Sequence, residues 1–115
     1  MIKSKDEMRR ASVVGLRGGV GELYQCHVLE KDETGGRMDM CCVFTIMPGR
    51  TIGIHTHDTN SEVYYLLKGE IVVNQDGVEH TVKEGGVVFT ADGASHSVEN
   101  RTNEPAEMLA IILPH

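Results

Sequence analysis

From residue 21 onwards, short apolar or alternating runs follow one another along the chain, with turn residues between them. Each run has the length and the β-branched or aromatic content of a β-strand, and Gly, Pro, Asn and Asp residues separate the runs. The pattern predicts strands at Leu23–Leu29, Met38–Met47, Thr51–Thr56, Glu62–Leu67, Glu70–Asn74, Val78–Val82, Val87–Thr90, His96–Asn100 and Ala106–Leu113. Many short strands at near-regular spacing favour an all-β sandwich or a closed barrel.

The connecting segments carry their own local signals. Asp76 and Gly77, between two alternating runs, indicate a tight β-hairpin. Ser4, with Glu7 three residues later, predicts a capping box and one helical turn over Ser4–Ala11. The glycine-rich segment over residues 15–21 lacks the frame of a phosphate-binding loop, so we interpret it as a turn.

Length and charge limit the class of protein. The chain of 115 residues has the size of one domain, and it shows no linker and no internal repeat. Its net charge of −6 disfavours nucleic acids and anionic membrane surfaces as partners. The charged N-terminus does not resemble a signal peptide, and the odd number of cysteines, three, disfavours a disulfide framework. We therefore expect a cytoplasmic protein.

Four residues stand at spacings that suit a metal site. His55 and His57 are two apart, so in a strand both imidazoles lie on one face. A short turn then returns the chain to Glu62, and His96 begins a later strand that reaches the same point if the sheet closes. The alternative is that these are ordinary surface or core histidines, as most single histidines are.

Three imidazoles and one carboxylate form a nitrogen and oxygen donor set. Such a set suits one divalent transition metal, Mn, Fe, Co, Ni or Zn, and the sequence does not choose among them. It is poor for Ca²⁺ and Mg²⁺, which prefer oxygen ligands. Four protein ligands leave free positions on a six-coordinate metal, where water, substrate or dioxygen can bind.

Glycines at fixed offsets from these ligands reveal a resemblance to the cupin family. The first cupin motif, G(x)5HxH(x)4E(x)6G, is matched at every position, by Gly49, His55, His57, Glu62 and Gly69. The second motif, G(x)5PxG(x)2H(x)3N, is matched by Gly85, Gly93, His96 and Asn100. Ala91 stands where the family usually has proline, which affects the stiffness of that turn and not the ligand set.

The resemblance implies a single-domain double-stranded β-helix, the jelly-roll cupin barrel, with the metal ligands at one end. It also implies a tendency to form a homodimer. We expect residues 21–115 to form the barrel and residues 1–20 to form an N-terminal arm. That arm is our candidate contact with a partner subunit, the alternative being a loosely ordered tail.

Few residues outside these four are candidates for a chemical role. Alternation from Glu62 predicts that Tyr64 faces the metal pocket and Tyr65 faces away, so Tyr64 is our candidate catalytic residue or, alternatively, pocket wall. We interpret His27, His80 and His115 as surface residues. The cysteine and methionine residues near residue 41 are expected to fill the core.

The cupin fold hosts many activities, so fold alone does not choose the function. The sequence favours a metalloenzyme acting on a small oxygen-rich organic molecule, of the dioxygenase, decarboxylase or isomerase type. The alternative is a non-catalytic cupin that binds or senses a small ligand. A structural protein with an incidental metal is a third possibility. A proton donor or acceptor beside the metal would favour the enzyme, and an apolar pocket the binding protein.

Overall fold

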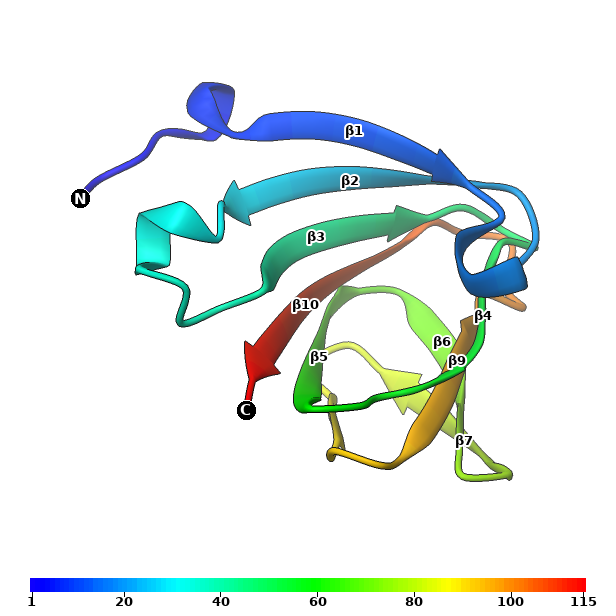
Figure 1. The fold of residues 1–115 in the computed structure, drawn as a ribbon. Coiled ribbons are helices and arrows are strands. Elements are labelled where there is room, and N and C mark those ends of the chain that lie inside the picture. The colour runs from blue at the N-terminus through cyan, green and yellow to red at the C-terminus, as the bar shows by residue number, and fades with distance from the viewer.

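Two antiparallel β-sheets pack face to face in the computed structural model, which describes residues 1–115 (Figure 1). The strands are β1 (Arg9–Val14), β2 (Glu22–Leu29), β3 (Met40–Ile46), β4 (Thr51–Thr56), β5 (Asn60–Lys68), β6 (Glu70–Gln75), β7 (Val78–Lys83), β8 (Val87–Thr90), β9 (Ser95–Glu99) and β10 (Ala106–Pro114). The larger sheet has the order β1-β2-β3-β10-β5-β8, and the smaller one β4-β9-β6-β7. The predicted all-β jelly-roll architecture is confirmed.

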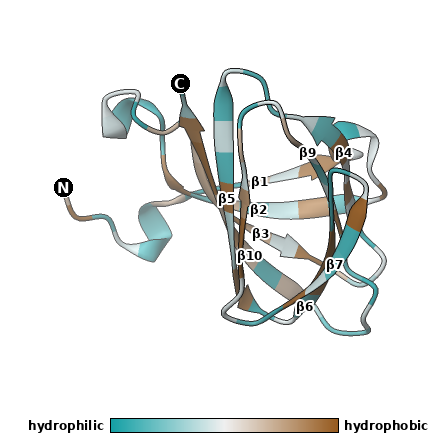
Figure 2. Cartoon of the chain, turned by 90° about the horizontal axis from the view of Figure 1, so that it is seen from below, coloured by the Kyte–Doolittle hydropathy of each residue, from teal (hydrophilic) through white to brown (hydrophobic).

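The helical content is three 3₁₀ turns, η1 (Lys5–Glu7), η2 (Leu16–Gly18) and η3 (Asp32–Thr34). None of them is long or apolar enough to cross a membrane. Apolar side chains that alternate along the strands fill the space between the sheets, and Figure 2 shows hydrophobic segments on strands of both sheets. The buried core includes Leu23, Phe44, Ile52, Leu66, Ile71, Val73, Val98 and Met108.

The predicted strands are present, with ends that move by at most two residues. The hairpin between β6 and β7 turns at Asp76 and Gly77, which both have positive φ (49° and 90°). Two positive φ angles in succession are the requirement of the two-residue turns that match strand twist, and Gly meets it without strain. The hairpin prediction is therefore confirmed.

The N-terminal segment differs from the expectation. The contact between Ser4 and Glu7 is present, with Ser4 Oγ donating to Glu7 Oε1 at 2.7 Å, but the helical turn ends at Glu7 instead of continuing to Ala11. Arg9 begins β1, which pairs along its whole length with β2 and forms one edge of the larger sheet. Sequence reasoning missed this strand because its pairing is long-range and only Ala11 and Val13 mark its inward face.

Candidate metal centre

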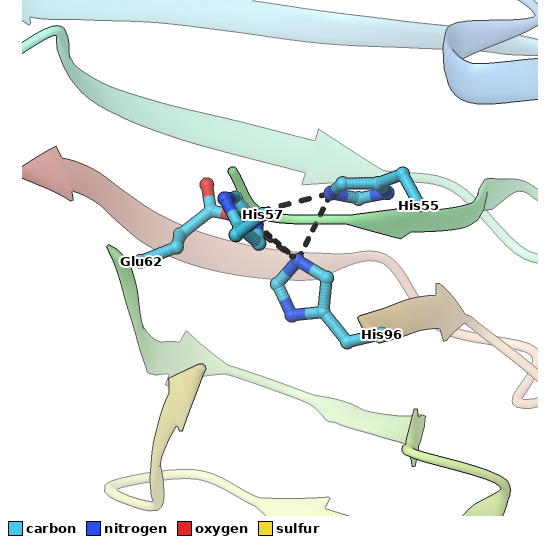
Figure 3. A group of neighbouring side chains, drawn as sticks. All are labelled: His55, His57, Glu62 and His96. Atoms are coloured by element: carbon cyan, nitrogen blue, oxygen red, sulfur yellow. Dashed lines mark hydrogen bonds and ion pairs between the residues drawn. The ribbon is translucent and has the colours of Figure 1, made fainter. Parts of the chain in front are cut away.

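The side chains of His55, His57, Glu62 and His96, which we call the histidine–glutamate cluster, converge on one point between the two sheets (Figure 3). Their potential ligand atoms all lie within 4.8 Å of one another. His96 Nε2 lies 2.9 Å from His57 Nε2 and 3.0 Å from His55 Nε2. Glu62 Oε1 lies 3.0 Å from the Nε2 atoms of both His57 and His96.

Strand pairing explains this convergence. His55 on β4 lies directly opposite His96 on β9, so both side chains project from the same face of the smaller sheet. His57 follows β4 by one residue, and β5 of the larger sheet brings Glu62 back beside it. The side chains of His57, Glu62 and His96 are at most 4% exposed, so the cluster is shielded from bulk water.

Hydrogen bonds at Nδ1 set the tautomers of the first two histidines. His55 Nδ1 donates to the carbonyl oxygen of Gly53 at 2.8 Å, and His57 Nδ1 donates to the amide oxygen of Asn60 at 2.6 Å. A carbonyl or amide oxygen only accepts, so the proton of each neutral ring is on Nδ1. Each Nε2 therefore presents a lone pair to the cluster.

His96 is fixed in the same tautomer by a chain of hydrogen bonds that runs through Thr90 and Gln75. Gln75 Nε2 donates to the carbonyl oxygen of Phe89 at 2.8 Å, which leaves the Gln75 amide oxygen as an acceptor. Thr90 Oγ1 donates to that oxygen at 3.0 Å and therefore accepts from His96 Nδ1, at 2.8 Å. The lone pair of His96 Nε2 thus also faces the cluster.

The ionisation of the cluster makes a bound cation favourable. Burial raises the pKa of Glu62, whereas hydrogen bonds from His55 and His96 and the charges of His96 and His57, all of which act when these imidazoles are protonated, lower it to about 2. Burial also holds the pKa of His96 below 6.5, against the opposing effect of Glu62. In the neutral tautomers that the Nδ1 hydrogen bonds set, the Nε2 lone pairs and the Glu62 carboxylate face one another, an arrangement that repels unless a cation lies between them.

The donor set fits a divalent transition metal. Three imidazole nitrogens and one carboxylate oxygen are ligands that Mn, Fe, Co, Ni and Zn accept. Nδ1 hydrogen bonds to carbonyl or side-chain oxygens are the outer contacts that orient metal-binding histidines. The histidine–glutamate cluster is thus compatible with one such metal, whose identity the residues leave open.

A cavity of about 150 Å³ opens beside the cluster. Its lining residues are Leu16, Arg17, Gln25, Met40, Phe44, Ile52, His55, His57, Glu62, Tyr64 and Ile112. Six of the eleven lining residues are hydrophobic, and the other five are Arg17, Gln25, His55, His57 and Glu62.

Tyr64 faces this cavity, and Tyr65 points outward and is 42% exposed, as the alternation predicted. The Tyr64 ring stacks on the His96 imidazole, and its hydroxyl lies 3.3 Å from His96 Nε2. Burial, followed by the charge of Glu62, raises the pKa of Tyr64 well above 10. Tyr64 is therefore a protonated hydrogen-bond donor at neutral pH.

The other predicted residues lie away from the cluster. His80 and His115 are exposed, as expected, whereas His27 is half-buried on β2. Cys42 is a buried core residue, and burial raises the pKa of its thiol to about 12. The turn at Ala91 closes without proline, because Ala94 N donates to the Ala91 carbonyl oxygen at 3.0 Å.

Sequence reasoning did not single out four residues that surround the cluster. Arg17 and Gln25 line the cavity from η2 and β2, and Thr90 and Gln75 hold His96. For Gln25 the sequence did contain a signal: it is two residues after Leu23 on the same strand, so both side chains are expected to face inward. Nothing in the sequence indicated that Arg17 reaches the cavity.

A two-sheet β-sandwich with a buried three-histidine, one-glutamate cluster at one end defines a cupin-type barrel. The family model described as "Cupin domain" matches residues 42–112, so the chain belongs to the cupin family.

A named protein and a solved structure from Thermotoga maritima are similar to this chain. The chain is 34% identical over 113 residues to a protein named oxalate-binding protein, an alignment that covers 98% of this chain and 93% of that protein. It also superposes on a crystal structure described as a predicted oxalate decarboxylase, with a TM-score of 0.95, 34% identity and full coverage of both chains. A crystal structure from Thermus thermophilus matches with a TM-score of 0.72 and 29% identity, covering 80% of this chain and 83% of that one.

Proposed function

We propose that this cupin binds one divalent transition metal through His55, His57, Glu62 and His96, and that a small oxygen-rich carboxylate such as oxalate binds beside it. The observation that carries the proposal is the inward orientation of the three Nε2 lone pairs. Each Nδ1 is already engaged, and the facing carboxylate is ionised. Mn, Fe, Co, Ni and Zn all fit this donor set.

The size of the cavity and the names of the relatives support a small carboxylate as the ligand. About 150 Å³ is well below the volume that drug-sized ligands occupy. The relative named oxalate-binding protein aligns over nearly the whole chain. When bound, the metal supplies a Lewis acid that polarises ligand oxygens. Apolar side chains such as Phe44 and Ile52 line the remaining space.

Turnover of the bound carboxylate, of the decarboxylase type, is the second function that the site supports. It is favoured by Tyr64, the only hydroxyl group among the cavity-lining residues, which lies beside His96 and keeps its proton at neutral pH. In a decarboxylation Tyr64 would donate a hydrogen bond to the reacting carboxylate. The lining contains no carboxylate besides Glu62 and is mainly apolar, so we place binding before catalysis.

The test begins with elemental analysis of the purified protein by plasma mass spectrometry, where we expect about one equivalent of a transition metal. Calorimetric titration of the metal-loaded protein with oxalate should then show saturable binding. A headspace assay for carbon dioxide over the same samples separates binding from turnover. A protein that contains no metal and takes up none on titration would overturn the proposal.

We also propose that the chain forms a homodimer through the outer face of its larger sheet. Tyr65 and Leu67 on β5 and Val87 and Phe89 on β8 are exposed apolar side chains on adjacent strands of that sheet. Exposed apolar groups gathered on one face are typical of interfaces. Light scattering of wild type and a Phe89→Lys variant tests this, since the variant is expected to be monomeric.

A further inference from the structure

The turn between β1 and β2 forms part of the cavity wall. Its residues Leu16 and Arg17 line the same cavity as the histidine–glutamate cluster, and the turn lies beside β4 (Figure 1). Arg17 is the only cationic residue in that lining, and Glu62 is the only acidic one. The N-terminal segment therefore contributes a positive charge to a site otherwise built by the barrel.

The turn is fixed against β4 by hydrogen bonds and by close backbone approach. Val20 N donates to Thr51 Oγ1 at 2.8 Å, and Thr51 N donates to the Val20 carbonyl oxygen at 3.1 Å. A Cβ atom at Gly53 would collide with the carbonyl group of Arg17, and a Cβ atom at Gly19 would collide with that of Thr51. The two segments thus approach as closely as only glycine permits.

The backbone of Arg17 is in the left-handed region, with φ 55° and ψ 30°. A residue other than glycine there costs free energy, of order 1 kcal/mol or more, and persists only where the surroundings enforce it. Gly15 and Gly18 also have positive φ and take it without cost, but at position 17 the chain has an arginine. The left-handed conformation is therefore adopted by an arginine that is exposed to solvent and also lines the cavity.

The guanidinium group of Arg17 has no partner within the protein. The ion pairs of the structure use Lys3, Arg9, Lys31 and Arg101 as their lysine or arginine partners, and Arg17 makes no side-chain hydrogen bond. Arg17 is exposed to solvent and also lines the cavity, which places it at the cavity mouth. An unpaired guanidinium group at a cavity mouth is suited to bind carboxylate oxygens in a bidentate manner.

We propose that Arg17 binds the carboxylate oxygens of a short dicarboxylate that face away from the histidine–glutamate cluster, and so selects doubly charged ligands over singly charged ones. This inference rests on the proposed function, since the ligand must also reach the cluster. Gln25, on the adjacent strand β2, adds an amide group to the same wall. The small cavity, of about 150 Å³, favours short diacids such as oxalate or malonate.

The experiment compares two chelating acids of similar size, oxalate, a dianion, and glycolate, a monoanion, by calorimetry on the metal-loaded protein. Arg17→Gln is the test variant. Arg10→Gln is the matched control, because Arg10 lies on the exposed part of β1, makes no ion pair and lines no cavity. Metal content and circular dichroism of each variant are measured in parallel.

We expect Arg17→Gln to keep its metal and to bind oxalate about 10-fold or more weakly, since the variant loses a charge-assisted hydrogen bond to the bound carboxylate. Glycolate binding should change by less than about threefold, and Arg10→Gln should behave as wild type. Equal oxalate affinity in wild type and Arg17→Gln would overturn the role of Arg17 and leave the proposed function intact. Wild type that binds neither metal nor oxalate would overturn both.

Discussion

His96 Nδ1 donates a 2.8 Å hydrogen bond to Thr90 Oγ1, and both residues are fully buried. Thr90 can accept this bond because its own proton is directed to Gln75, which in turn is held by the backbone of β8. The chain of donors and acceptors leaves only one orientation for the imidazole, with the Nε2 lone pair toward Glu62. A hydrogen bond of this kind, to the nitrogen that does not face the metal site, orients the imidazole and is expected to affect metal affinity as well as the geometry of the ligands.

Thr90→Val removes the acceptor while keeping the shape of the side chain. We expect metal affinity to fall about 10- to 100-fold, since His96 loses the partner that fixes its tautomer. Competition with a fluorescent chelator measures this. Thr90→Ser, which keeps the hydroxyl group, is the control and should retain most of the affinity. Unchanged affinity in Thr90→Val would show that this chain of hydrogen bonds does not orient His96.

His96→Ala removes a proposed ligand, whereas Thr90→Val removes only the hydrogen bond that orients it. A larger loss of metal affinity is therefore expected. Metal content after dialysis should fall from about one equivalent to near zero, because the loss of a ligand exceeds the roughly 10- to 100-fold cost of losing an outer contact. His80→Ala, on the exposed face of β7, is the matched control and should keep its metal. Retention of a full equivalent by a folded His96→Ala protein would remove His96 from the ligand set.

Metal binding should stabilise the barrel against heat. A ligand present at about 100 times its dissociation constant and bound only by the native state adds about 2.7 kcal/mol to the free energy of unfolding. For a domain of this size that corresponds to a rise in Tm of roughly 10 °C. Differential scanning calorimetry with and without a chelator measures it. Identical midpoints would contradict the proposed metal site, and the Glu62→Gln variant should show little chelator effect.

The stability of the metal-free protein should fall as the pH is lowered, in two windows. The pKa of His96 is lowered by burial, so below about pH 6.5 the unfolded state takes up a proton that the folded state resists. The pKa of Glu62 falls from 4.5 to about 2, so its contribution is present above pH 4.5 and is lost between pH 4.5 and about 2. Urea unfolding in the presence of a chelator measures the free energy at each pH.

Glu62→Gln provides the control for the lower window. Glutamine does not titrate, so the decline between pH 4.5 and about 2 should become shallower, whereas the decline just below pH 6.5 should remain. The same slope in both proteins through the lower window would show that Glu62 is not the group responsible.

The strand pattern and the two motifs predicted most of the fold and the members of the histidine–glutamate cluster from the sequence alone. Alternation located the strands of the barrel within two residues, and Asp76 with Gly77 located a hairpin, because strand pairing and tight turns are encoded locally. The spacing of His55, His57, Glu62 and His96 identified the cluster, because β-strand geometry places such residues on one face. Their role as ligands remains a prediction.

Only the tertiary structure decided what surrounds the cluster. β1 was missed because its stability comes from pairing with β2, and Arg17 reaches the cavity because Gly19 and Gly53 let distant backbones meet. Thr90 and Gln75 hold His96 through contacts between strands of different sheets. These features depend on which segments pack together, and local periodicity carries no information about such contacts.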